Sequence, residues 1–414
     1  GYDSKGNAVK RTFVDEDKQP ITTSLGHAIE EIDYNENGVP TRRRVFDATG
    51  KPTLHREGWH RAEITLDDRN QETRRRYFDI KNDPAWHADG YAGWDQEFDQ
   101  RGNMISMTVV GHDGQPAYGK HGYCCERNKY SDAGHLIETS HFDPEGNPAF
   151  NTTVMASRVN VKYDRLGNDI EYRWFDTAGL PTRGSKGYAV VKVKFDDRGN
   201  RIEIASFDER GQSTPGRLNG EIFSAPIVRS EFDARGNQTL LGNFDAQGQP
   251  ITGPMGFHRR VVEFDARSLQ VEYRCFDIDG SPGKHWQGHS RVTLVYNEAK
   301  QVIERRFYDA NNKLMVVPYS GYAVQKSEFD RLGNTISVAY FDANEEPILE
   351  HGGFHSARAA YEGNRVIEET YFGIDGKPKR SHLGYAKYTC KYDDRGNQSE
   401  FATYDENDAL TDFE

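Results

Sequence analysis

Carboxylates are the residues of this chain that most often stand at spacings suited to chemistry. In Asp277-Ile278-Asp279-Gly280 two of them alternate as at the start of a calcium-binding loop. No Glu follows at the twelfth position, however, and Asp-x-x-Gly recurs throughout the chain. The Asp side chain of such a segment can accept an amide hydrogen bond two residues on, and Gly supplies a positive φ. We therefore interpret these Asp residues as turn residues and predict no metal site.

Histidines are the second candidates. His55 and His60 resemble the histidine pair of a zinc protease, but they stand five residues apart rather than four, and a glycine between them disfavours a helix. His60, His258 and His355 occupy equivalent positions, and we expect them to face the surface. The chain also lacks nucleophile-elbow, phosphate-loop and dinucleotide motifs. We predict that the protein is not an enzyme and has no cofactor.

An internal repeat organises the rest of the sequence. An aromatic-Asp-x-x-Gly-Asn signature, as in Tyr163 to Asn168, returns every 31 to 33 residues apart from one step of 37. Phe-Asp-x-x-Gly-x-Pro follows about a dozen residues later, as in Phe175 to Pro181. Gly-aromatic-small comes third, as in Gly187 to Ala189. The 414 residues thus predict a single array over 1–414 of about thirteen units, with partial units at both ends and an exposed insertion at 212–226.

Alternation within each unit predicts β-strands. Ile170, Tyr172 and Trp174 would share one face of a strand, and Glu171 and Arg173 the other. The fold class is therefore all-β: tandem 32-residue, two-strand repeats forming an elongated or superhelically coiled antiparallel meander of roughly 25 strands. A closed shell or a propeller is the alternative.

Composition limits the kinds of partner that we expect the chain to bind. A net charge of −12 without a long basic block argues against nucleic acid. No apolar run is long enough for membrane insertion, so we expect a soluble chain, without a prediction of its compartment. The four cysteines, which show no paired spacing, are interpreted as small strand residues.

The signature Tyr163-Asp164-Arg165-Leu166-Gly167-Asn168 resembles the YD repeat of bacterial RHS-type proteins and of teneurins. The hairpins and the Gly-aromatic motif also resemble MORN-like repeats. These resemblances imply a β-shell that encloses or displays other domains, or a scaffold that binds partners, in the bacterial cytoplasm or at the cell surface. The extra Asp-x-x-Gly-x-Pro loop and the missing RHS self-cleavage motif depart from the RHS pattern.

Arginine and tryptophan mark the candidate binding residues. Arginines recur three residues before the second-signature Asp and are densest in two adjacent N-terminal units, where three of the five Trp also lie. We expect this region to bind an acidic protein or a glycan, and other domains of a longer chain to be further partners. The candidate residues are Arg42, Arg44, Arg74, Arg76, Trp59, Trp86, Trp94 and Tyr91.

Overall fold

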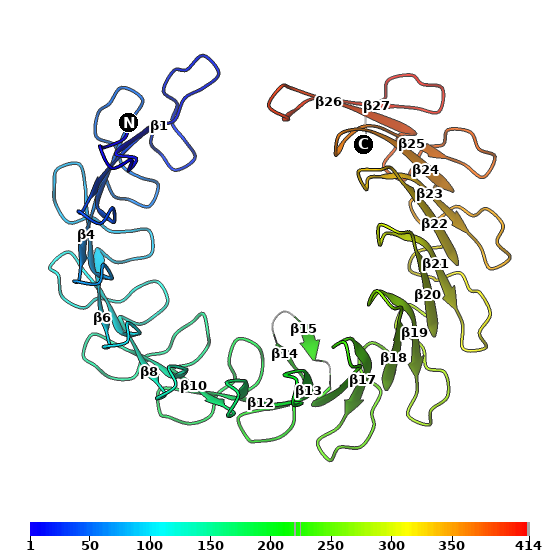
Figure 1. Ribbon diagram of the computed structural model, residues 1–414, viewed down its shortest axis with the longest axis horizontal. Helices are drawn as coiled ribbons and strands as arrows, with labels where there is room; N and C mark the ends of the chain where they lie inside the picture. Colours follow the sequence, from blue (N-terminus) through cyan, green and yellow to red (C-terminus); the bar gives the residue numbers. More distant parts are fainter. Residues whose placement is uncertain (219–220, 224, 412–414) are drawn as a thin grey trace. The chain divides into compact units, whose positions relative to one another are not determined.

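The computed structural model describes residues 1–218, 221–223 and 225–411, with the backbone alone for 216–218 and 221–223. These residues form strands and turns, and no helix among them could cross a membrane. They divide into two compact units, Gly1–Val193 with Ala205–Leu218, and Lys194–Ile204 with Asn219–Glu414. Within each unit, consecutive strands lie side by side in chain order and loops project on both sides of the row (Figure 1).

Each hairpin combines a strand of about six residues with one of about seven. The first strands are β1 (Lys10–Thr12), β2 (Ile29–Tyr34), β3 (Pro40–Phe46), β4 (Arg61–Leu66), β5 (Glu72–Phe78), β6 (Gly93–Phe98), β7 (Met104–Val110), β8 (Cys125–Tyr130), β9 (Leu136–Phe142), β10 (Arg158–Tyr163), β11 (Asp169–Phe175), β12 (Val190–Phe195) and β13 (Arg201–Phe207). The remaining strands are β14 (Gly216–Leu218), β15 (Glu221–Phe223), β16 (Ile227–Phe232), β17 (Gln238–Phe244), β18 (Arg259–Phe264), β19 (Gln270–Phe276), β20 (Arg291–Tyr296), β21 (Val302–Tyr308), β22 (Val324–Phe329), β23 (Thr335–Phe341), β24 (Ser356–Glu362), β25 (Arg365–Phe372), β26 (Lys387–Tyr392) and β27 (Gln398–Tyr404).

The strands form an antiparallel meander. Of the described strands, 25 belong to one sheet in which successive strands pair. Its ladder does not close on itself, because β1 pairs only with β2 and β27 only with β26 among the described residues. The predicted all-β meander is therefore confirmed, and the closed alternative is not found. In the predicted insertion at 212–226, β14 and β15 form a small separate sheet. The exposure of its tip lies outside the described residues.

The first-signature Asp builds the turn inside each hairpin. In the turn after β10, Asp164 Oδ1 accepts the Asn168 amide at 3.0 Å, and Asn168 Nδ2 donates to Asp164 Oδ2 at 2.9 Å. Gly167 takes a φ of 88°, and the strand register shifts at Tyr163, as a bulge beside a type I turn requires. These hydrogen bonds, first that of the Asn168 side chain, lower the pKa of Asp164. The turn role predicted for these Asp residues is confirmed.

The two faces of the sheet differ in chemistry. In the hairpin of β4 and β5, Ala62 pairs with Tyr77, and Glu63 with Arg76, so these pairs lie on opposite faces. We call the face of Ala62 and Tyr77 the aromatic face and the other the charged face. The aromatic face holds the main clusters of buried side chains, covered by the loop that follows the second strand of each hairpin. On the charged face Arg61 stacks over the ring of Phe78, 4.1 Å from its centre.

Three kinds of hydrogen bond join neighbouring hairpins, in different combinations from one pair to the next. The Tyr163 hydroxyl donates to the carbonyl of Leu136 in the preceding hairpin at 3.0 Å. The turn residue Arg69 donates to the carbonyls of Asp99 and Gln100 in the following turn. Third-signature loops stack through their backbones. The distances of these bonds within the first compact unit are 2.8 Å for Arg56 N to Leu25 O and Ala88 N to Glu57 O, 2.9 Å for Lys120 N to Asp89 O, 3.0 Å for Thr152 N to His121 O, and 3.1 Å for Ser185 N to Val154 O.

We expect Tyr163→Phe to lower the free energy of unfolding by about 1 kcal/mol, because it leaves the ring in place and removes a part-buried hydrogen bond. Urea denaturation monitored by circular dichroism measures this. Tyr2→Phe is the matched control, since Tyr2 stands at the equivalent position of its unit and is 76% exposed. Equal effects of the two substitutions would contradict the assigned role of the tyrosine hydroxyl.

Candidate partner-binding surfaces

The predicted arginines lie on the charged face and are already paired. Asp33 and Asp95 each bind two of them. The ion pairs are Arg42 with Asp33 at 3.3 Å, Arg44 with Asp33 at 3.0 Å, and Arg74 and Arg76 with Asp95 at 2.8 Å each. Ion pairs at such accessible positions contribute little to stability, but they occupy donors that an acidic partner would need. The arginines therefore form a ladder alternating with carboxylates.

Two of the three predicted tryptophans lie on the opposite, aromatic face. Trp59 is only 7% exposed and packs with Tyr77 in a buried cluster. Trp94 and Tyr91 pack against the same cluster, and the Arg75 guanidinium lies 4.6 Å from the centre of the Trp94 ring. The structure thus brings Trp59, Trp94 and Tyr91 together but separates them from the four predicted arginines by the thickness of the sheet.

Trp86, the third tryptophan, belongs to a surface that the sequence analysis missed. It is 47% exposed, and its ring lies 4.5 Å from that of His112. It stands two residues after the second-signature Pro, as do Leu54 and Tyr118, which are 44% and 54% exposed, and the half-buried Phe150. We call Leu54, Trp86, Tyr118 and Phe150 the loop column. Aligning the units at this Pro would have found it.

The loop column has a regular spacing. Its four members occupy consecutive loops that backbone hydrogen bonds stack in register. Two strands separate equivalent loops, so the side chains repeat about every 10 Å. Exposed aromatic and aliphatic side chains in such a row are typical of protein contacts and of platforms for sugar rings.

Two buried histidines and a glutamate link neighbouring loops of the loop column. The Glu57 carboxylate lies 3.3 Å from His55 Nδ1 and 3.1 Å from His87 Nε2. Burial lowers the pKa of His55. Burial would raise the pKa of Glu57, but hydrogen bonds from Trp59 and His87 outweigh it and leave that pKa lowered. This cluster ties two neighbouring loops together beneath the loop column.

The surface position expected for one equivalent histidine is wrong. His258 is only 8% exposed, and its Nδ1 lies 2.9 Å from the carbonyl of Asn243. His60 and His355 are half-buried, and each places Nδ1 within 2.9 Å of a carbonyl of the strand beneath it. A carbonyl only accepts, so each Nδ1 donates, and these histidines hold their loops to the sheet.

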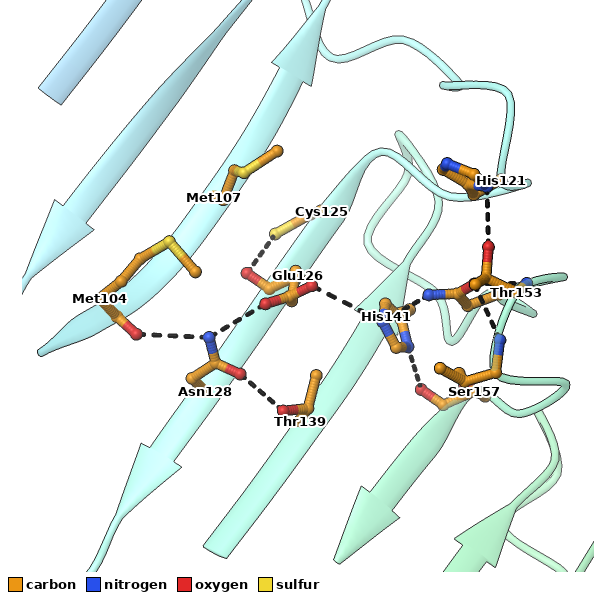
Figure 2. A network of polar contacts seen from close by, with 12 residues as sticks. Met104, Met107, His121, Cys125, Glu126, Asn128, Thr139, His141, Thr153 and Ser157 are labelled. Atoms are coloured by element: carbon orange, nitrogen blue, oxygen red, sulfur yellow. Dashed lines mark hydrogen bonds and ion pairs between the residues drawn. The ribbon is translucent and has the colours of Figure 1, made fainter. Parts of the chain in front are cut away.

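A polar network replaces apolar residues on the aromatic face of β8 and β9 (Figure 2). Asn128 Oδ1 accepts from Thr139 at 2.8 Å, and Asn128 Nδ2 donates to Glu126 at 3.1 Å and to the carbonyl of Met104 at 3.3 Å. His141 lies beside this group and is only 2% exposed. Buried networks of this kind fix one arrangement of their strands when every member has a partner.

The hydrogen-bond partners of His141 show which of its two ring nitrogens carries the proton. Its Nδ1 lies 3.1 Å from the carbonyl of Ser157 and must donate, while its Nε2 accepts from Asn151 Nδ2 at 3.0 Å. Glu126 Oε2 is 3.8 Å from Nε2. Burial lowers the pKa of His141, although the Ser157 carbonyl and Glu126 oppose it. The imidazole is therefore a neutral link between β9 and the loop after it.

All four cysteines are buried free thiols. Cys125, Cys275 and Cys390 are strand residues, as predicted, whereas Cys124 directly precedes β8. Burial raises the pKa of Cys124 to about 11 and that of Cys275 to about 12, so both are protonated at neutral pH. Across the described part of the chain, no three His, Cys, Asp or Glu side chains are grouped to hold a metal ion.

The chain matches solved structures of toxin proteins. The chain matches a TccC3 mutant of the Photorhabdus luminescens Tc holotoxin pore at 14% identity, over 97% of its own length and 18% of the matched chain, with a TM-score of 0.48. It matches the TcdB2-TccC3-TEV crystal structure at 11% identity, over 97% of its length and 23% of the matched chain, with a TM-score of 0.35. It thus spans less than a quarter of either chain. No protein family and no curated protein matches the sequence.

We expect Trp59→Ala to lower the free energy of unfolding by about 3–5 kcal/mol, because it empties part of a buried cluster. Trp86→Ala, at an exposed position, should cost less than about 1 kcal/mol. Urea denaturation of both variants checks the division of these tryptophans between core and surface. A large loss of stability from Trp86→Ala would contradict it.

We expect acid to destabilise the protein through His141. Its pKa in the folded state lies below the unfolded value of about 6.5, so the unfolded chain binds more protons once the pH falls below that value. The stability contributed by the neutral imidazole is therefore complete above about pH 6.5 and is lost as the pH falls toward the folded pKa. His141→Tyr, which places an aromatic residue where other units have one, should flatten the dependence of stability on pH by at most about 1.4 kcal/mol per pH unit. Identical pH profiles for the variant and the wild type would contradict this role.

Proposed function

We propose that the protein is a non-catalytic repeat scaffold that binds a protein or glycan partner through the loop column. The observation that carries the proposal is the exposure of Leu54, Trp86 and Tyr118 at one position of consecutive stacked loops. An isolated exposed apolar residue is ordinary, whereas a periodic row of them favours contact with a partner.

The arginine ladder of β3 and β5 is the second candidate surface for the same function. Arg42 and Arg74 keep 44% and 57% of their side chains exposed. A partner carrying carboxylates would have to compete with Asp33 and Asp95 for these donors. We therefore favour the loop column, whose side chains need lose no ion pair on binding.

A structural wall or stalk that encloses or displays other domains is the alternative function. The three kinds of hydrogen bond between hairpins favour it, since they would stiffen the array whether or not it binds a ligand. This function needs no exposed aromatic side chain, so variants of the loop column distinguish it from the scaffold.

We expect the double variant Trp86→Ala with Tyr118→Ala to lose at least tenfold in affinity for ligands selected on the wild-type chain. A glycan array and a phage-displayed peptide library supply those ligands, and surface plasmon resonance measures their affinities. The matched control is Leu166→Ala, because Leu166 is 73% exposed but lies in a hairpin turn outside the loop column. Arg44→Ala with Arg76→Ala tests the second surface.

Whether glycans or peptides lose affinity for the variants shows which class of partner the protein binds. If every selected ligand binds the Trp86/Tyr118 variant as tightly as the wild type, the loop column is not the binding surface. If the arginine variant alone loses binding, the charged face takes its place. Retention by both variants favours the structural wall.

A further inference from the structure

Arg305 on β21 stands in the wall between two adjoining cavities on the aromatic face. One has a volume of about 520 Å³ and lies toward β22 and β23, and the other, of about 400 Å³, lies toward β19 and β20. Arg305 is the one residue that lines both, and it is the only charged side chain in either lining. A half-buried cation therefore faces two spaces large enough for a small molecule.

This arginine has no carboxylate partner. Arg75, at the equivalent position of β5, pairs with Glu72 at 2.7 Å. Three residues before Arg305 the sequence has Val302 instead. The adjacent Glu304 pairs with Arg306 at 2.6 Å, on the charged face. No ion pair forms between Arg305 and any carboxylate in the ranges that the structure describes, so its charge is available to an anionic ligand.

The rest of the lining of the cavity on the β22 side is neutral, and it includes side chains that form hydrogen bonds. Tyr322 donates to Gln325 Oε1 at 3.2 Å, and Gln325 Nε2 donates to Ser327 at 3.3 Å, so the amide is oriented from both ends. Gln301 completes this side, with its amide held by the carbonyl of Gly333 at 2.9 Å. Such amide and hydroxyl groups match the alternating donors and acceptors of a polyhydroxylated ligand.

Two tyrosine rings lie near the guanidinium. Tyr322 and Tyr340 lie 4.7 Å apart, ring centre to ring centre. Burial raises the pKa of Tyr340 to about 12, with Tyr322, Glu350 and Glu369 adding to the rise and Arg305 opposing it. The hydroxyl therefore stays protonated, and the two rings offer apolar planes beside the charge.

We propose that the Arg305 cavities bind an acidic sugar. In the cavity toward β22 and β23, its carboxylate would pair with the guanidinium, its ring would lie against Tyr340, and its hydroxyls would meet Gln301, Gln325 and Ser327. One arginine among neutral donors and acceptors fits one carboxylate on a hydroxylated ring better than a phosphate dianion, which draws on several charged or backbone donors. The inference deepens the proposed scaffold function, and it rests on a different surface from the loop column.

The test is binding of glucuronate and N-acetylneuraminate to the full chain, measured by isothermal titration calorimetry. Methyl glucoside, which lacks the charge, and benzoate, which lacks the hydroxyls, are the matched probes. We expect both acids to bind at least tenfold more tightly than either matched probe. Arg305→Gln should weaken the acids at least tenfold, and Arg305→Lys, which keeps the charge but not the planar fork, should weaken them less.

Arg75→Gln is the control variant, because that arginine is already paired. It should leave the affinity for the acids unchanged, and thermal unfolding shows whether each variant is folded. Absence of acid binding to the wild type, equal binding of methyl glucoside, or unchanged binding to folded Arg305→Gln would each overturn the proposal. If Arg305→Gln does not fold, Tyr340→Leu, which removes the ring against which the sugar would lie, decides: unchanged acid affinity in that folded variant overturns the proposal. Failure here leaves the loop column untouched, since Trp86→Ala and Tyr118→Ala test that surface separately.

Discussion

A single sheet without a second sheet against it must cover its aromatic face with its own loops. Many of the described hairpins meet that constraint in the same way, because the segment after the second strand folds back and inserts an aromatic or histidine side chain, such as Trp59 or His289, into the cover. The loop is held by its neighbour as well as by the strand beneath it. Removing water from the aromatic face therefore depends on adjacent hairpins being in register, which explains why the repeat length varies so little.

The same constraint separates residues that the fold needs from residues that are free to do something else. The turn Asp, the positive-φ Gly and the loop aromatic residue have fixed structural tasks in each unit that keeps them. In the N-terminal hairpins the residue two positions after the second-signature Pro has none of these tasks, and it is there that Trp86 and Tyr118 are exposed. On the aromatic face, Arg305 is unusual for another reason, since an equivalent position elsewhere has both an arginine and its carboxylate.

How much the sequence predicts depends on whether the deciding contact is local. The turn role of Asp164 follows from residues within the turn, and the alternation of Tyr172 and Trp174 with Glu171 and Arg173 follows from strand geometry, so both predictions are confirmed. The grouping of arginines with tryptophans, by contrast, depends on which face a loop crosses. Strand alternation places Arg44 opposite to Val45, but nothing local places Trp59 above Val45. For the same reason the burial of His258 under its loop could not be predicted, because its partner, the Asn243 carbonyl, is fifteen residues away in the sequence.

Because the loop column repeats similar side chains at a regular spacing, a partner could bind it in more than one register. A partner engaging two positions of the loop column could shift by one hairpin and find similar chemistry, at a step of about 10 Å. The row breaks where Arg183 stands two residues after its Pro, and its members differ in size from Leu54 to Trp86. Because of these departures from periodicity, the two ends of the loop column differ and the column stops at a defined loop. A partner that binds in a single register would therefore have to contact the irregular positions. A partner that binds equally well in every register would instead gain affinity from the number of equivalent binding positions.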